Sequence, residues 1–215
     1  MSTIKNLLFD LGGVIIDLDR QRCVDALGAL GMKDAGDFLG LYGQKGDFLA
    51  LERGEIDAPE FYSRVRRLMP DGVADTQIRE AFNMFLTGIP VRRLEALRRL
   101  RAEGYGIYLL SNTNPVMMES KIADEFRKEG LEMKDYFDGT VCSYEAKCYK
   151  PEPEIFRYTA VHCGIRPEET LFLDDSQANV DAAKREGFNA VHVPPGSEFT
   201  DILTTFLQSQ AFISI

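Results

Sequence analysis

The chain has 215 residues, of which 45% are hydrophobic and 27% are charged, and it carries a net charge of −9 at pH 7. The length fits one large domain or a core domain with a smaller insert, and the composition is that of a soluble globular protein. The acidic balance argues against a nucleic-acid partner, because phosphate backbones are bound by clustered lysine and arginine side chains. It does not exclude a small phosphorylated substrate, since one lysine and a metal ion supply a local positive field.

The cysteines and the apolar segments indicate in which cellular compartment the protein is expected. Cys23, Cys142, Cys148 and Cys163 form no C-x-x-C pair and have no histidine at zinc-ligand spacing. We therefore predict free thiols in a reducing compartment. The N-terminus has no signal-peptide cleavage pattern, and no apolar segment is long enough to span a bilayer. These features predict a cytoplasmic protein with no membrane partner.

The first predicted element is a strand over residues 4–9. Its apolar run leads directly to Asp10, and Gly12 and Gly13 follow. Such a run bounded by glycines is typical of a buried parallel strand, and Asp10 would lie at its carboxyl end, where open α/β sheets bind their ligands. The glycines let the backbone turn sharply and approach whatever Asp10 faces. The alternative is a turn-forming aspartate that only satisfies local backbone amides.

For residues 17–88 the sequence predicts helices and loops, with no strand up to Gly88. Helical patterns cover residues 20–30, 48–53, 59–69 and 76–86. Pro59 and Thr76 suit helix starts, and Gly54 suits a helix end. We therefore predict that residues 17–88 form a helical domain inserted after the first strand. Residues 1–16 and 89–215 would then form the core domain.

From residue 90 onward, helices alternate with strands. In the helix that begins near Val91, an apolar stripe leaves Arg92, Arg93, Arg98 and Arg99 on the other faces. Strands are predicted at 107–110, 140–142, 171–173 and 190–193, and further helices at 115–129, 153–163, 177–186 and 199–208. Asn114 would cap the helix that starts at Pro115. The alternation predicts an α/β fold, a doubly wound parallel sheet with helices on both faces.

Polar groups follow successive strands of this predicted sheet. They are Asp10, Ser111 with Asn112, Lys150 ahead of a helix, and Asp174 with Asp175. The carboxyl ends of parallel strands share one edge of the sheet, so these groups can converge. Each has an ordinary explanation when taken alone: loop hydrogen bonding, a surface charge, or a turn or helix cap. Their joint appearance in this order favours a functional site.

Four segments together resemble the haloacid dehalogenase superfamily of phosphohydrolases: FDLGGV, LLSNTN, YKPEPEIF and LFLDDSQANVDAA. The resemblance covers nearly the whole chain, and the insert lies where that superfamily carries a small α-helical cap. The segment LERGEI and the spacing of Asp17 and Asp19 most resemble the branch that includes bacterial α-D-glucose-1-phosphate phosphatase. The resemblance implies a hydrolase of a small phosphomonoester, with a sugar 1-phosphate as the first prediction. A cap that closes over the site and a monomer or weak homodimer are also expected.

The resemblance also implies a role for each motif residue. Asp10 would be the nucleophile that forms an aspartyl-phosphate. Mg²⁺ would be held by Asp10, the backbone carbonyl of Gly12 and Asp175, with Asp174 as a further or more distant carboxylate. Lys150 would offset charge on the phosphoryl oxygens, and Ser111 and the amide of Asn112 would hydrogen-bond the same oxygens. Asn179 and Asp181 would lie behind these contact residues.

One position departs from the pattern of most phosphatases in the superfamily. They carry a second aspartate two residues after the nucleophile, where this chain has Gly12. General acid–base catalysis, worth roughly 10²–10⁴-fold, is therefore missing from its usual place. The glucose-1-phosphate phosphatase branch shares the glycine. Asp17, Asp19 and Glu52 are candidates to supply the proton, each weighed against an ordinary surface or helix-capping role.

The same departure leaves other functions open. The 2-haloacid dehalogenases of the superfamily also lack the second aspartate, and they displace halide without metal. They lack the acid pair as well, so Asp174 and Asp175 favour metal-dependent phosphate chemistry. A phosphomutase would need the missing aspartate. A non-catalytic ligand-binding or regulatory module has only Gly12 in its favour, against an intact nucleophile, lysine and metal carboxylates.

Overall fold

The computed structural model describes residues 3–40 and 46–213, with side chains described up to residue 209. Positions 1–2, 41–45 and 214–215 of the predicted domain ranges lie outside these residues. Five strands form one parallel sheet in the order β5-β4-β1-β6-β7. They are β1 (Asn6–Phe9), β4 (Gly106–Ser111), β5 (Gly139–Cys142), β6 (Thr170–Asp174) and β7 (Asn189–His192). The predicted parallel α/β sheet is confirmed.

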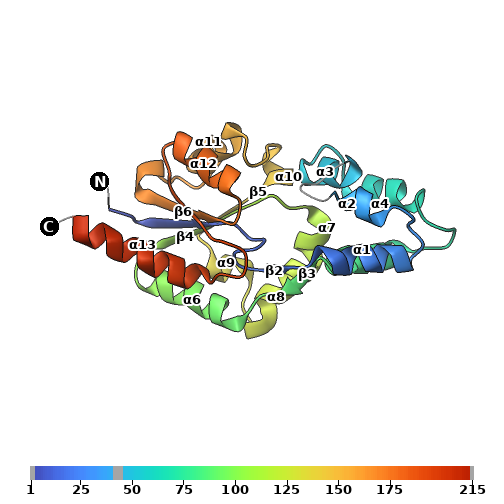
Figure 1. Cartoon of the computed structure of the whole chain (residues 1–215), viewed down its shortest axis with the longest axis horizontal. Coiled ribbons are helices and arrows are strands. Elements are labelled where there is room, and N and C mark those ends of the chain that lie inside the picture. The colour runs from blue at the N-terminus through green and yellow to red at the C-terminus, as the bar shows by residue number, and fades with distance from the viewer. Residues whose placement is uncertain (1–2, 41–45, 214–215) are drawn as a thin grey trace.

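Helices cover both faces of this sheet (Figure 1). Helices α11 (Pro153–His162) and α12 (Gln177–Arg185) lie on one face, and α6 (Val91–Ala102) and α13 (Phe199–Ile213) lie on the other. Alternate side chains of β1 enter two separate cores: Leu7 and Phe9 join one cluster, and Leu8 joins the other. Phe9 meets Phe199 of α13 edge-on, with ring centroids 5.1 Å apart. Burial on both faces explains why the first strand is an unbroken apolar run.

A second group of helices lies at the end of the molecule away from both termini (Figure 1). It comprises α1 (Arg20–Ala29), α2 (Ala35–Leu39), α3 (Gly46–Glu52), α4 (Ala58–Arg66) and α5 (Asp75–Asn83). Its centre is aromatic, because Phe82 packs against Phe61 and Phe48 with centroids 5.0 and 5.4 Å away. Asp19 accepts hydrogen bonds from the first turn of α1, and Asp57 does the same for α4. These caps begin helices where the sequence predicts them.

A short antiparallel ribbon joins this helical group to the sheet domain. Strand β2 (Asp17–Leu18) pairs with β3 (Leu86–Gly88), and the Asp19 amide donates to the Phe85 carbonyl over 2.8 Å. The expectation of no strand before Gly88 was therefore wrong, and the helix predicted over 76–86 ends at Asn83. Strands of two and three residues are too short to show an alternation of apolar residues, and the sequence gives no sign that these two segments pair, because they lie far apart in the chain.

The remaining helical segments connect the sheet strands. They are α7 (Pro115–Met117), a π-helical turn (Met118–Ile122), α8 (Ala123–Phe126), α9 (Met133–Tyr136), α10 (Ser143–Ala146) and 3₁₀ turns at Arg127–Glu129 and Pro167–Glu169. Asn114 caps the first of them by accepting from the Met117 amide at 3.0 Å. All four cysteines are free thiols. Among the described helices, none has the length and apolar character needed to cross a membrane.

Arg93 does not lie on an exposed helix face, as its place in the sequence suggests, but is only 4% exposed. Its guanidinium donates to the Ile15 carbonyl over 3.1 Å, to Asp17 over 2.7 Å and to Glu198 over 3.1 Å. This one side chain therefore ties the loop after β1 to β2 and to the start of α13. The helical pattern alone could not predict its burial, because the partners are 76 to 105 residues distant.

The stability of this junction should depend on pH. Hydrogen bonds from Arg92 and Arg93 lower the pKa of Glu198 from 4.5 to about 2. A lowered folded-state pKa gives stability that is complete above pH 4.5 and is lost as the pH falls toward 2. We expect Glu198→Gln to reduce the free energy of unfolding at pH 7, and the gap to wild type to close in acid. Urea unfolding across this range, with exposed Glu103→Gln as control, tests the prediction, and a gap independent of pH would contradict it.

Candidate active site

The register of the sheet places three polar residues side by side. Phe9 pairs with Leu109 on one side and with Leu173 on the other. Asp10 therefore follows β1 level with Asp174, the last residue of β6, and one residue short of Ser111, the last residue of β4. The Asp10 amide donates to the Leu173 carbonyl over 2.9 Å, which holds the residue against the edge of the sheet. All of these side chains face the carboxyl edge, where ligands bind in such folds.

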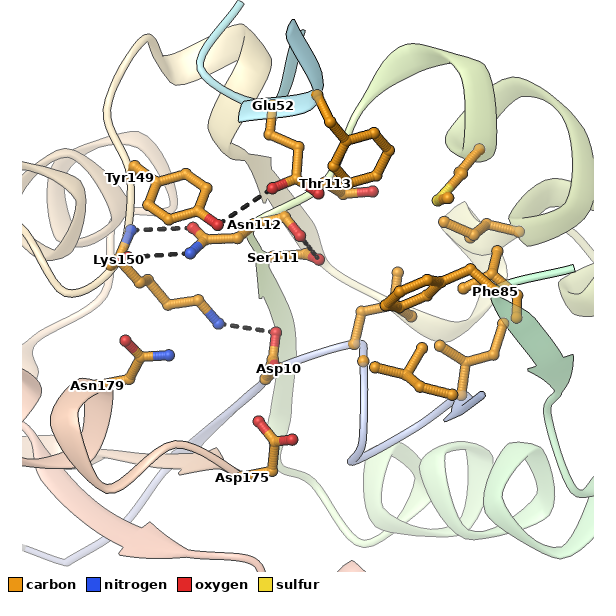
Figure 2. Close-up of a pocket in the computed structure, with 18 residues that line it drawn as sticks. Asp10, Glu52, Phe85, Ser111, Asn112, Thr113, Tyr149, Lys150, Asp175 and Asn179 are labelled. Carbon is orange, nitrogen blue, oxygen red and sulfur yellow. Dashed lines mark hydrogen bonds and ion pairs between the residues drawn. The ribbon is translucent and has the colours of Figure 1, made fainter. Parts of the chain in front are cut away.

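A cavity of about 220 Å³ lies at this edge (Figure 2). One wall is polar and comes from the sheet domain: Asp10, Gly12, Ser111, Asn112, Tyr149, Lys150, Asp175 and Asn179. The opposite wall is mostly apolar and comes in part from the helical group and the ribbon: Leu18, Phe48, Glu52, Phe85 and Leu86. Every predicted contact residue except the fully buried Asp174 therefore lines this one cavity, and residues of the insert face them.

Lys150 is the central cation of the site and is only 2% exposed. Its ammonium group lies 2.7 Å from Asp10 Oδ1, 2.7 Å from Asp174 Oδ2 and 3.0 Å from the Leu110 carbonyl. The Asn112 side chain holds the Lys150 main chain at both its amide and its carbonyl, over 2.9 and 3.0 Å. The side-chain amide of Asn112 is therefore already hydrogen-bonded. Only the main-chain N–H of Asn112 is left to make the predicted contact with phosphate.

Three carboxylates cluster at the site, and two of them, Asp10 and Asp174, contact this ammonium group. Asp10, Asp174 and Asp175 each place an oxygen within 4.8 Å of the others. Burial raises the pKa of Asp10; Lys150 opposes the shift, and the charges of Asp174 and Asp175 add to it. Asp175 forms no salt bridge within the described residues. An excess of negative charge on hard oxygen ligands is what a magnesium ion needs, so the donor set fits Mg²⁺.

The loop after Asp10 approaches the third carboxylate closely. Gly13 has φ +76°, and a Cβ atom there would lie 2.3 Å from Asp175 Oδ2. A larger residue would therefore displace Asp175 from the site as well as strain the backbone. Gly12, whose carbonyl is the predicted metal ligand, lines the same cavity.

The other candidates divide between the site and the surface. Asn179 donates to Asp174 over 2.9 Å and lines the cavity, whereas Asp181 is exposed and accepts from Gln177 on its own helix. The expectation that Asp181 lies close behind the contact residues is therefore wrong, because its helix turns it outward. Asp17 is bound to Arg93 and Asp19 caps α1, so both are engaged elsewhere.

Tyr149 is a cavity residue that sequence analysis missed. Its hydroxyl donates to Glu52 Oε2 over 3.1 Å (Figure 2). The only sequence signal is its position directly before Lys150, and a single tyrosine forms no pattern that could be recognised.

A family model described as haloacid dehalogenase-like hydrolase matches residues 4–187. The chain belongs to the haloacid dehalogenase-like (HAD-like) hydrolases. This HAD-like hydrolase is 37% identical over 206 residues to a D-ribitol-5-phosphate phosphatase from Bacteroides thetaiotaomicron, covering 96% of this chain and 100% of that protein. The predicted superfamily is confirmed, while the narrower likeness to the glucose-1-phosphate phosphatase branch stays a prediction.

Solved structures share the whole fold of this HAD-like hydrolase. A HAD family enzyme from B. thetaiotaomicron, in complex with magnesium and inorganic phosphate, matches with a TM-score of 0.86 at 40% identity, covering 93% of this chain and 98% of that one. A HAD-like family hydrolase from Porphyromonas gingivalis matches with a TM-score of 0.87 at 33% identity, covering 96% of this chain and 98% of that one.

Proposed function

We propose that this HAD-like hydrolase is a Mg²⁺-dependent phosphatase of a small phosphorylated polyol or sugar, acting through an aspartyl-phosphate on Asp10. One observation carries the proposal: Asp10, Asp175 and the buried Lys150 ammonium group line a single cavity, and a third carboxylate, the fully buried Asp174, lies beside them. The similar protein named D-ribitol-5-phosphate phosphatase and the similar structure with magnesium and phosphate support it.

The hydrogen bonds that each carboxylate already makes indicate which of them are available to bind the metal ion. Asp174 is fully buried and accepts from Lys150, the Ser176 amide and Asn179. We therefore assign Asp174 to positioning Lys150, and Asp10, Asp175 and the Gly12 carbonyl to holding Mg²⁺. When bound there, the ion would screen the repulsion between the nucleophile and the substrate phosphate.

The reaction would proceed in two displacements at phosphorus. A carboxylate oxygen of Asp10 bonds to phosphorus as the ester P–O bond breaks, and water then displaces Asp10 and releases inorganic phosphate. The Lys150 ammonium, the Ser111 hydroxyl and the Asn112 main-chain N–H would stabilise the phosphoryl oxygens, where negative charge accumulates.

The helical group would act as a cap over the core, with residues 17–88 as the cap and 1–16 and 89–215 as the core. Phe48, Phe85 and Leu86 would exclude water from the bound substrate. The cavity of about 220 Å³ favours a small metabolite over a nucleotide or a phospholipid. A sugar 1-phosphate, the first prediction from sequence, and a polyol 5-phosphate both belong to this class. The monomeric or weakly dimeric state and the cytoplasmic location stay predictions.

The charge distribution disfavours the two alternatives. A haloacid is itself a carboxylate, and Asp174 and Asp175 would repel it in a site that works without metal. A non-catalytic module would have no physical reason to bury Lys150 between two carboxylates, because desolvating these charges costs several kcal/mol.

A substrate panel tests the proposal. We expect phosphate release from ribitol 5-phosphate and from sugar 1-phosphates to exceed release from nucleotides, and to fall by about 100-fold in EDTA until Mg²⁺ is restored. Parallel assays should show no halide release from 2-chloropropionate. Faster hydrolysis of nucleotides or phospholipids would overturn the substrate class. Metal-independent halide release would favour the dehalogenase, and inactivity in every assay would favour the module.

A further inference from the structure

Glu52 is a buried carboxyl group that the two displacements above leave without a role. It is the last residue of α3, lines the cavity and is only 5% exposed. Figure 2 shows it entering from the helical group and pointing toward the polar wall that carries Asp10. Among the described residues no lysine or arginine pairs with it, although buried carboxylates usually have a cationic partner.

The position of Glu52 is fixed against the sheet domain. The Ser143 hydroxyl donates to the Glu52 carbonyl over 2.6 Å, and it also accepts from the Thr113 amide over 3.0 Å. The neighbouring Arg53 lies over the Tyr149 ring, 5.3 Å from its centroid. These contacts fix the Glu52 main chain, and the hydrogen bond from Tyr149 orients its carboxyl group, as the positioning of a group that transfers a proton requires.

Glu52 also holds the protonation state that an acid needs. Burial raises its pKa to about 8, the Tyr149 hydroxyl and the Asn114 side chain oppose the shift, and the negative charge of Asp10 adds to it. Most of the molecules would carry the proton at pH 7.

We propose that Glu52 is the general acid and base of this site, in place of the side chain that Gly12 lacks; the inference rests on the proposed phosphatase function. As the Asp10–phosphorus bond forms and the ester bond breaks, the proton of Glu52 passes to the leaving oxygen. The Glu52 carboxylate then takes a proton from the water that attacks the aspartyl-phosphate, which regenerates the acid and frees Asp10.

The leaving group provides the test. Comparing Glu52→Gln with wild type, we measure kcat/KM for ribitol 5-phosphate, or the best alkyl phosphate of the panel, and for p-nitrophenyl phosphate. This parameter reports only steps up to transfer to Asp10. Because p-nitrophenolate leaves without a proton, we expect a loss of about 10²–10³-fold for the alkyl ester and under about threefold for the aryl ester. Glu55→Gln, an exposed neighbour, should match wild type on both.

The outcomes distinguish a failure of the role proposed for Glu52 from a failure of the proposed phosphatase function. Equal losses on both esters would make Glu52 a structural residue, and no loss on either would also overturn the inference. If wild type hydrolyses neither ester, the proposed function itself fails. Should Glu52→Gln fold poorly, Tyr149→Phe is the second variant. Removing the hydroxyl should raise the pKa of Glu52 and move the alkaline limb of the kcat/KM profile to higher pH, and an unmoved limb would count against the inference.

Discussion

Replacement of Asp10 by asparagine should lower kcat by about 10⁴-fold or more with Mg²⁺ at saturation. The amide is almost the same size but is not nucleophilic, so no aspartyl-phosphate can form. Folding should survive, because Lys150 keeps Asp174 as its partner at 2.7 Å. Phosphate release from the best substrate of the panel measures the effect, and circular dichroism checks the fold.

Asp25→Asn is the matched control for this variant. It removes the same charge from an exposed site on α1 and should leave kcat within about twofold of wild type. If the Asp10 variant kept a tenth of the wild-type rate, Asp10 could not be the nucleophile, and its place beside Lys150 would have to be structural.

Replacement of Lys150 by methionine should cost stability as well as activity. Its loss leaves the buried carboxylates of Asp10 and Asp174 without the ammonium group that both contact at 2.7 Å. Breaking a buried pair in this way costs about 3–5 kcal/mol, because the remaining charge stays desolvated. We expect that reduction in the free energy of unfolding, measured in urea, together with loss of phosphate release.

Lys5→Met provides the control for the lysine variant. Lys5 pairs with Glu169, but its side chain is 62% exposed, so its loss should cost less than about 1 kcal/mol. If the two variants were equally stable, the contacts of Lys150 would not hold the site together in the way described.

Sequence reasoning succeeded where one chain segment carried its own signal. The run before Asp10 and the run before Asp174 are apolar because both faces of their strands are buried, and the order of strands and helices then predicts a shared edge. Asn114 was predicted correctly as a cap for the same reason, since a cap and its helix are adjacent.

It failed where distant segments decide the structure. The β2–β3 ribbon forms because residues about 70 positions apart pair, and Arg93 is buried because the distant segment at Ile15 and Asp17 and the residue Glu198 supply its partners. Tyr149 gains its role only when α3 brings Glu52 to it. The error over Asp181 has a local cause instead, because the period of helix α12 turns this side chain outward, where it accepts from Gln177.

Trapping the phosphoenzyme tests the central claim most directly. Wild-type enzyme mixed with Mg²⁺ and substrate, then quenched in acid within one turnover, should yield a peptide phosphorylated on Asp10, and neutral hydroxylamine should remove the group. Glu52→Gln should form the adduct rapidly from p-nitrophenyl phosphate and lose it slowly, since its second step lacks a base. Rapid phosphate release with Asp10 unmodified at every time point would contradict the account.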